Sequence, residues 1–211
     1  MSSGLLLDTR APVRSKRMHV KPPDHPSQTG SAGLVFFRHL VQQLIRSHHR
    51  DRAALRKVVI ERLRMSRDPM GYIGELLDQC VVDNRSEGMD IAVDVLTHFG
   101  GQVIEYAREF WRKDVKRWEA QPPHPRHHIH DDIWYVLLRA AGASNLDILQ
   151  KIPMLSYCAA DGTPVVREAS VRALGDMGGK IAVRLARRLG GSDASPMVRE
   201  AAAEVLDDLE G

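Results

Sequence analysis

Long apolar runs, aromatic residues and cysteines are all scarce in this sequence, and each scarcity excludes a class of protein. No apolar stretch approaches the roughly 20 residues that a membrane-spanning helix needs. Aromatic residues make up 5% of the chain, and alternating β-branched segments bounded by turns are absent, so we expect almost no β-strand. Cys80 and Cys158 stand alone on helical patterns. They predict buried free thiols in a reducing compartment, not a disulfide framework.

The opening segment also lacks the features of a secretory signal. Residues 1–17 contain a single apolar patch of three leucines, which is shorter than the apolar core of a signal peptide. The whole chain is 43% hydrophobic and 27% charged, as is ordinary for a soluble globular protein. We therefore expect a cytoplasmic protein with no membrane partner.

One phrase of sequence occurs twice near the C-terminus. Residues 163–179 read TPVVREASVRALGDMGG, and residues 195–211 read SPMVREAAAEVLDDLEG, with matching positions 32 residues apart. Between the copies lies KIAVRLARRLGG, a second helical pattern closed by a glycine pair. The unit is therefore helix, turn, helix. A period of about 20–50 residues is typical of a solenoid.

Each residue type in the phrase has a local physical reason. Thr163 and Ser195 can accept a backbone N–H as N-caps, and the proline after each suits the first helical position. The glycines that follow permit a left-handed end to the helix. The small side chains of Ala169 and Ala201 allow a neighbouring helix to approach closely.

This phrase resembles the HEAT-like repeat family, in particular the short repeats of the phycobilin-lyase type. The family phrase is approximately Asp-x-x-Pro-x-Val-Arg-x-x-Ala-x-x-Ala-Leu-x-x-Leu-Gly, and the match is close from Asp161 to Gly178. Fainter copies occur at residues 95–104 and 137–143. The resemblance implies an all-α solenoid of antiparallel helix pairs, about ten helices in all. It also implies that Arg167 and Arg199 tie one repeat to the next.

Three regions follow from these patterns. Residues 1–32 are predicted to be an extended or disordered basic arm, because proline, serine and glycine leave no apolar stripe there. Residues 33–82 contain three helical patterns, at 33–48, 51–66 and 68–82, that continue into the HEAT-like region of residues 83–211 as one solenoid. Residues 1–60 hold eleven Lys or Arg against three Asp or Glu, so the basic excess lies at the front.

The arm is a candidate for binding phosphate backbones or acidic protein surfaces. Its candidate residues are Arg14, Lys16, Arg17 and Lys21. A solubilising tail without a partner is the alternative interpretation.

Basic residues also recur at four-residue steps on the second helices of the repeat region. They are Arg108, Arg112, Lys116, Lys180, Arg184 and Arg187 or Arg188. The resemblance implies that the second helices line the concave side of the solenoid, which would make this a partly basic groove for an acidic ligand. A solvated face is the alternative. Lys151 is the only base on the helix between them, so the stripe is interrupted.

The sequence PPHPRHHIHDD, residues 122–132, is the densest group of possible metal ligands. Imidazole and carboxylate groups can bind zinc, but their spacing does not match a helical His-Glu-x-x-His site. The three prolines favour a polar loop between repeats, after which Asp131 or Asp132 caps the next helix. We predict no metal and no cofactor. We also expect the three tryptophans, Trp111, Trp118 and Trp134, to serve mainly in packing.

No catalytic motif stands out. The sequence has neither a phosphate-cradling glycine-rich motif nor a Gly-x-Ser-x-Gly elbow, and it lacks the His-Glu pairs of the HEAT-like di-iron hydroxylases. We predict a non-catalytic scaffold or assembly factor that binds a protein partner through its concave face and basic arm. The alternative is a protein that binds the phosphate backbone of nucleic acid. A weaker alternative is a lyase or DNA glycosylase, the latter with Asp114 beside Trp111 and Trp118.

Overall fold

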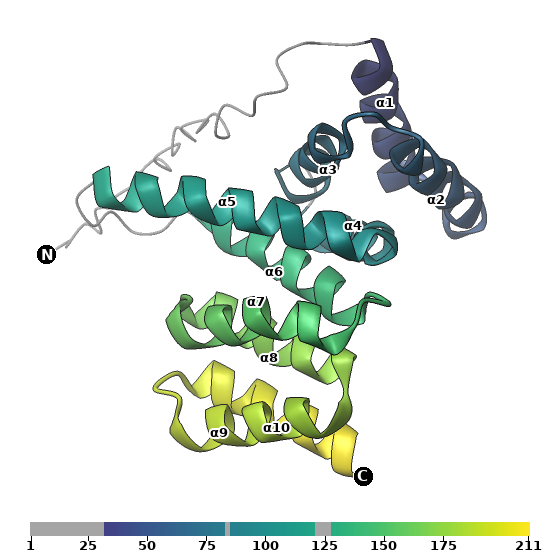
Figure 1. Cartoon of the computed structure of the whole chain (residues 1–211). Helices are drawn as coiled ribbons and strands as arrows, with labels where there is room; N and C mark the ends of the chain where they lie inside the picture. The colour runs from purple at the N-terminus through teal and green to yellow at the C-terminus, as the bar shows by residue number, and fades with distance from the viewer. Residues whose placement is uncertain (1–31, 83–84, 121–127) are drawn as a thin grey trace, which may run out of the picture.

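The computed structural model describes residues 32–82, 85–120 and 128–211, and the secondary structure of these residues is entirely helical (Figure 1). The α-helices are α1 (Ala32–Arg46), α2 (His49–Arg64), α3 (Pro69–Leu77), α4 (Arg85–Leu96), α5 (Gly100–Ala120), α6 (His128–Ala143), α7 (Ile148–Asp161), α8 (Pro164–Met177), α9 (Gly179–Ser192) and α10 (Pro196–Glu210). A π-helical turn, Asp78–Val82, extends α3, and a 3-10 turn, Thr97–Phe99, joins α4 to α5. The predicted all-α class is confirmed. Of the predicted arm, residues 1–31 lie outside the described residues, and Ala32 is already the first residue of α1.

Several predicted helix starts are found as expected. Asp68 caps α3 by accepting a hydrogen bond from the backbone N–H of Gly71 at 2.9 Å. Thr163 caps α8 by accepting one from Val166 at 3.2 Å. Ser195 occupies the N-cap position of α10 as predicted, but the predicted capping bond is wrong, because its hydroxyl accepts no backbone N–H. Asp193 instead accepts the backbone N–H of Ser195 at 2.8 Å, so a carboxylate two residues earlier orders this turn.

The glycine pairs behave differently from one another. Gly178 and Gly179 adopt φ of 70° and 80°, so the left-handed turn predicted between α8 and α9 is present. The prediction that Gly190 and Gly191 close the next helix is wrong, because α9 continues through them to Ser192. A Cβ at Gly190 would lie 3.3 Å from the Cβ of Ala202. The missing side chain therefore lets α9 approach α10.

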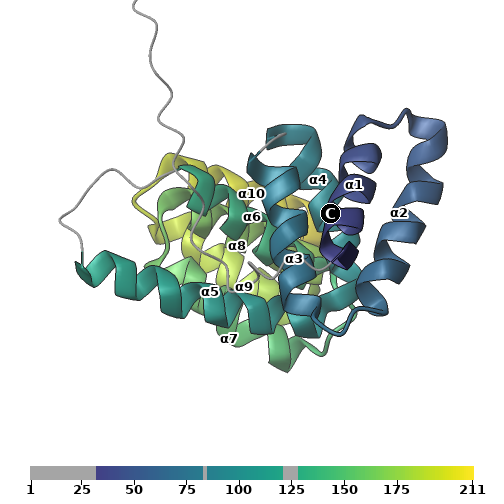
Figure 2. The same ribbon diagram turned by 90° about the horizontal axis from the view of Figure 1, so that it is seen from above.

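The helices from α5 onward form two layers. Figures 1 and 2 agree that α5, α7 and α9 lie on one side and α6, α8 and α10 on the other. Each helix of the first layer packs on its neighbour in the second, α5 on α6, α7 on α8 and α9 on α10. Within the second layer α8 contacts both α6 and α10 directly. We call these the α5–α7–α9 layer and the α6–α8–α10 layer.

Small residues bring the α6–α8–α10 layer together. Ala169 on α8 is fully buried, as the repeat phrase predicts. A Cβ added to Gly142 on α6 would lie 2.4 Å from the carbonyl oxygen of Ala173, and one added to Gly175 would lie 2.9 Å from the side chain of Val205. Contacts this short leave no room for a larger residue, so the backbones of α6 and α8 lie almost in contact, and Val205 of α10 packs directly on the backbone of α8 at Gly175.

Ion pairs connect the same layer at intervals that follow the repeat. Arg139 on α6 binds Asp176 on α8 with two hydrogen bonds, of 2.6 and 3.1 Å. Arg172 on α8 binds Glu204 on α10 at 3.0 Å. The arginine comes first in each pair, and its partner follows 37 or 32 residues later. The spacings of about one repeat between Leu138, Leu174 and Leu206 in the sequence match this arrangement.

The helices α1 to α4 continue the same core. Phe37 on α1 is fully buried and lies 4.6 Å from Tyr72 on α3, measured between ring centroids. Arg38 binds Glu75 through hydrogen bonds of 2.6 and 2.9 Å, again from one helix to the next but one. Cys80 and Cys158 are buried free thiols, as predicted. Burial raises the pKa of Cys158 to about 12.

Candidate interaction surface on the α5–α7–α9 layer

Helix α7 presents apolar side chains to solvent. Leu149 is 73% exposed and Tyr157 is 47% exposed, and Pro153 between them is exposed as well. Their four-residue spacing places all three on one face of the helix. Isolated apolar residues are common on protein surfaces, but three at helical spacing make a continuous stripe.

Lys151 points the opposite way. Its side chain is buried and its Nζ donates hydrogen bonds to the carbonyl oxygens of Gly142, at 2.8 Å, and Ser144. These carbonyls lie at the end of α6, where a helix has no further N–H groups to satisfy them. Desolvation lowers the pKa of Lys151 from its ordinary value. The only base of α7 therefore serves as a C-terminal cap for α6 and contributes no charge to the surface.

Aromatic contacts join the stripe to α5. Tyr157 packs edge-on against Trp111 of α5, with ring centroids 4.7 Å apart. Trp111 in turn lies 5.6 Å from Trp134, which is buried in α6. The predicted packing role thus holds for Trp134, while Trp111 is half-buried and Tyr157 forms the outer end of the cluster. The side chains of Trp118 and Asp114 lie outside the described residues.

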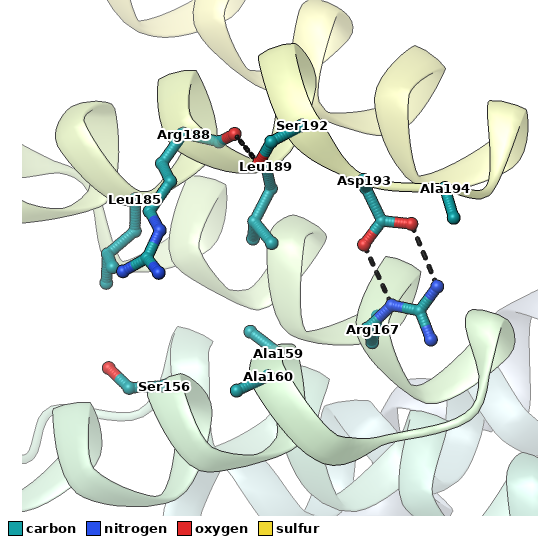
Figure 3. Close-up of a pocket in the computed structure, with 10 residues that line it drawn as sticks. All are labelled: Ser156, Ala159, Ala160, Arg167, Leu185, Arg188, Leu189, Ser192, Asp193 and Ala194. Carbon is teal, nitrogen blue, oxygen red and sulfur yellow. Dashed lines mark hydrogen bonds and ion pairs between the residues drawn. The ribbon is translucent and has the colours of Figure 1, made fainter.

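A groove of about 390 Å³ separates α7 from α9 (Figure 3). Its apolar lining comes from α7 through Ala159 and Ala160, and from α9 through Leu185 and Leu189. Arg188 on α9 points from its helix toward α7. The polar residues Ser156 and Ser192 also line the groove.

The far end of the groove is closed by an ion pair. Arg167 on α8 donates two hydrogen bonds to the carboxylate of Asp193, each 2.8 Å long, and a third to the carbonyl oxygen of Gly162 at 2.9 Å. These bonds lower the pKa of Asp193 below its ordinary value. Arg199 donates to the carbonyl oxygens of Asp193 and Ala194. Arg167 therefore ties its repeat to the next, whereas Arg199 bonds only the turn that opens its own repeat, so the tie implied for Arg199 is not found among the described residues.

The predicted basic residues of α9 divide into two sets. Arg187 turns toward α10 and pairs with Glu210, whereas Arg188 enters the groove. The sequence did not decide which of these two arginines belongs to the basic stripe, and in the structure it is Arg188 that lines the groove. Lys180 and Arg184 are exposed, and neither makes an ion pair with a described residue.

On α5, Arg108 and Arg112 are likewise exposed and form no ion pair within the described chain. The side chain of Lys116 lies outside it, as do the arm residues Arg14, Lys16, Arg17 and Lys21. That the basic residues line a concave face stays a prediction.

The histidine-rich segment differs from its prediction where the structure describes it. The helix α6 begins at His128, so Asp131 and Asp132 lie inside a helix and neither is its N-cap. Asp131 instead accepts a hydrogen bond from the hydroxyl of Thr163, at 3.0 Å, and so ties α6 to the start of α8. An acidic residue in the first turn also complements the helix dipole.

Neither a cluster of metal ligands nor a membrane-spanning helix is found among the described residues. Within the described ranges no three His, Cys, Asp or Glu side chains lie together as a metal site would require. The side chains of His124, His127, His128 and His130 are not among them, so the absence of a metal there stays a prediction. None of the described helices combines the length and apolar character needed to cross a bilayer.

The exposed stripe on α7 is the feature that sequence reasoning missed. The four-residue spacing of Leu149, Pro153 and Tyr157 was visible in the sequence, but an apolar stripe is more often a core stripe. The exposure of the stripe could have been predicted from the opposite face of α7, where Lys151, Leu155 and Cys158 form the buried side of the helix. Because one apolar face of α7 already packs in the core, the second apolar face is left exposed to solvent.

Comparison with known proteins finds no matching family model, no matching curated protein and no matching solved structure. The HEAT-like resemblance therefore rests on the residues of the repeat phrase, and the function must be argued from the geometry of the surface.

Proposed function

We propose that this chain is a non-catalytic interaction scaffold, an α-solenoid of HEAT-like repeats that binds a protein partner across its α5–α7–α9 layer. The observation that carries the proposal is the surface of α7, where Leu149, Pro153 and Tyr157 are exposed and the only lysine is buried. Apolar and aromatic residues supply most of the binding energy in protein interfaces, and aromatic anchors are enriched among their hot spots.

The basic residues on either side fit the rim of such an interface. Arg108 and Arg112 lie on α5, and Arg184 and Arg188 lie on α9, so positive charge flanks the apolar stripe on both sides. Rim charges mainly steer the approach of a partner and select its charge. The predicted basic arm, residues 1–32, stays a second expected contact with the same partner.

Nucleic-acid binding is the second candidate, and the same exposed cations favour it. A phosphate backbone would be neutralised by bases that follow it without a break. Helix α7, which lies between the two basic helices, supplies none, because Lys151 is buried against the end of α6. A protein partner accounts for both the cations and the apolar stripe, whereas nucleic acid accounts only for the cations.

A retention experiment with a paired control tests the proposal. The full-length protein is immobilised, extract from its native source is treated with nuclease and passed over it, and bound proteins are identified. We expect a set of proteins that the wild type retains and that the double variant Leu149→Ser, Tyr157→Ser loses. Substituting the exposed Val58 on α2 and the exposed Met65 directly after it by serine is the matched control and should change nothing. The proposal fails when the two double variants retain the same proteins as the wild type.

Binding to random 20-base-pair duplex separates the two candidates. For a protein-binding scaffold we expect weak binding that the variant Lys180→Glu, Arg184→Glu hardly alters. Micromolar or tighter binding that falls steeply with salt, and that is weakened by this variant, would instead establish the nucleic-acid function.

A further inference from the structure

We infer that the groove between α7 and α9 is a binding site for a short acidic segment of the partner protein. Arg188 would receive a carboxylate, and the apolar residues beside it would receive a small aliphatic side chain. The inference rests on the proposed function and specifies the chemistry of the partner at one place on the α5–α7–α9 layer.

The charge of the groove determines what it attracts. Arg188 projects from α9 toward α7 (Figure 3) and makes no ion pair with a described residue. Arg184, one turn earlier on α9, is exposed and also makes no ion pair with a described residue. At the other end, Arg167 and Asp193 neutralise each other. The net charge offered to a ligand is therefore positive and lies at the Arg188 end. A guanidinium group binds a carboxylate with two parallel hydrogen bonds, so a carboxylate complements this end.

The size and lining of the groove limit the ligand. A volume of about 390 Å³ is at the small end of ligand-binding pockets, which span about 300–1,000 Å³. The space therefore suits a few residues of a chain. Leu185 and Leu189 on α9 and Ala160 on α7 give the groove an apolar lining on both sides near Arg188. An acidic residue followed closely by a valine, leucine or isoleucine would satisfy both parts.

Two hydroxyl groups can bind the backbone of such a segment. Ser156 on α7 has no hydrogen-bond partner among the described residues and faces the groove. Ser192 on α9 donates its hydroxyl to the carbonyl oxygen of Arg188 at 2.8 Å, which leaves the oxygen free to accept a peptide N–H. An extended segment exposes N–H and C=O groups that these hydroxyls can reach, whereas a helix has already used most of them.

The charge also argues against the chain's own arm as the occupant. Residues 1–31 carry five Lys or Arg against two Asp or Glu, so they have the same sign as Arg188. A partner with acidic residues is the complementary choice.

Peptide selection tests the inference directly. The immobilised full-length protein is offered a random library of displayed 12-residue peptides, and the same selection is run on the variant Arg188→Glu. We expect the wild type to select an Asp or Glu within three positions of Val, Leu or Ile, and the variant to lose this preference. A synthetic peptide of the selected sequence should bind the variant at least about tenfold more weakly, measured by fluorescence anisotropy.

Two further variants identify the place of binding. Ala160→Phe fills the groove without changing its charge and should also weaken the peptide at least about tenfold. Lys57→Glu makes the same charge change on α2, outside the α5–α7–α9 layer, and should leave the affinity within about twofold. Circular dichroism melting of each variant checks that the fold is intact.

Three results would overturn the inference, and they are distinguishable from failure of the proposed function. A selection without acidic preference, or a peptide whose affinity is unchanged by both Arg188→Glu and Ala160→Phe, removes the groove as the site. Where that peptide is instead lost on Leu149→Ser with Tyr157→Ser, the proposed scaffold function stands. Self-association of the wild type in sedimentation velocity that Arg188→Glu abolishes would make a second copy the occupant.

Discussion

Helix α8 packs directly on α6 and α10, whereas helix α7 is separated from α9 by a groove. The difference follows from the residues at the contacts. Gly142 and Gly175 allow backbones of the α6–α8–α10 layer to approach, and arginines bridge from each helix to the next. In the α5–α7–α9 layer the side chains at the corresponding places include Leu185 and Arg188, which remain partly or fully exposed.

The comparison separates the residues that hold the repeats together from those available to another molecule. Polar groups of the α6–α8–α10 layer meet partners within the chain, including Arg139 with Asp176 and Thr163 with Asp131. The α5–α7–α9 layer presents cations without partners among the described residues beside exposed apolar side chains. Substitutions should therefore act mainly on stability in the first layer and mainly on binding in the second.

The largest effect should come from Ala169→Arg. This residue is fully buried in α8, so a long charged side chain would be forced into a helix–helix contact, and we expect a loss of more than about 3 kcal/mol in the free energy of unfolding. Ala203→Arg, on the exposed face of α10, is the matched control and should cost less than about 0.5 kcal/mol. Denaturant titration measures both. Equal stability of Ala169→Arg and wild type would disprove the close packing of this layer.

Breaking the link between Arg167 and Asp193 should have the next largest effect. Arg167→Ala removes two hydrogen bonds from a carboxylate that is only 6% exposed, and we expect a loss of about 2–3 kcal/mol in the free energy of unfolding. The control is Arg64→Ala, which breaks the exposed pair of Arg64 and Glu61 and should cost less than about 0.5 kcal/mol. Similar losses for the two variants would contradict a special role for the repeat-phrase arginine.

The same pair makes a prediction about pH. Arg167 holds the pKa of Asp193 below its ordinary value in the folded chain, while the unfolded carboxyl titrates near about pH 4. The unfolded state therefore binds more protons between these two pKa values, and the stabilisation present above about pH 5 is lost as the pH falls through and below 4. The stability of Asp193→Asn should depend less on pH over this range than that of wild type. If the free energy of unfolding of the variant and of wild type changed equally with pH, the lowered pKa of Asp193 would be contradicted.

A smaller loss is expected for Lys151→Met. The variant keeps the volume of the side chain but leaves the carbonyls of Gly142 and Ser144 without their donor, so we expect a loss of about 1–2 kcal/mol in the free energy of unfolding. Lys113→Met, at an exposed position on α5, is the control and should be neutral within about 0.5 kcal/mol. Unchanged stability of Lys151→Met, with retention of extract proteins also lost, would mean that Lys151 contacts the partner.

The smallest effect on stability should come from the groove. Arg184 and Arg188 make no ion pair with a described residue, so Arg184→Glu with Arg188→Glu should change the free energy of unfolding by less than about 0.5 kcal/mol. Thermal melting checks this. A large loss of stability would show that these two arginines stabilise the repeats, and would contradict a role confined to ligand binding.

The local signals in the sequence predicted the fold more completely than the surface. The cap at Thr163, the buried Ala169 and the ties made by Arg167 all depend on residues within one repeat or on the next copy of it. Which of Arg187 and Arg188 enters the groove depends on the distance between helices, which no pattern within α9 specifies.

Lys151 shows the same limit. Its position in the sequence matches the buried face of α7. A lysine is buried only where hydrogen-bond acceptors are present, and here the acceptors are carbonyl oxygens at the end of α6, which the sequence of α7 does not reveal. The left-handed turn at Gly178 and Gly179 was predictable from the glycine pair. Gly190 instead remains helical, and Ala202 of α10 packs against it. Contacts between elements decided the outcomes at Lys151 and Gly190, whereas at Ser195 the predicted capping bond was replaced by one to Asp193 within the same turn.

Site-specific photo-crosslinking tests most directly the claim that the α5–α7–α9 layer binds a protein partner. Benzoylphenylalanine is placed at Tyr157 on α7 in one full-length protein and at Ala203 on α10 in another, and each is irradiated in nuclease-treated extract from the native source. We predict a defined protein adduct from position 157, absent when Leu149→Ser is added, and no adduct from position 203. An adduct from position 203 alone, or from both positions equally, would contradict the account.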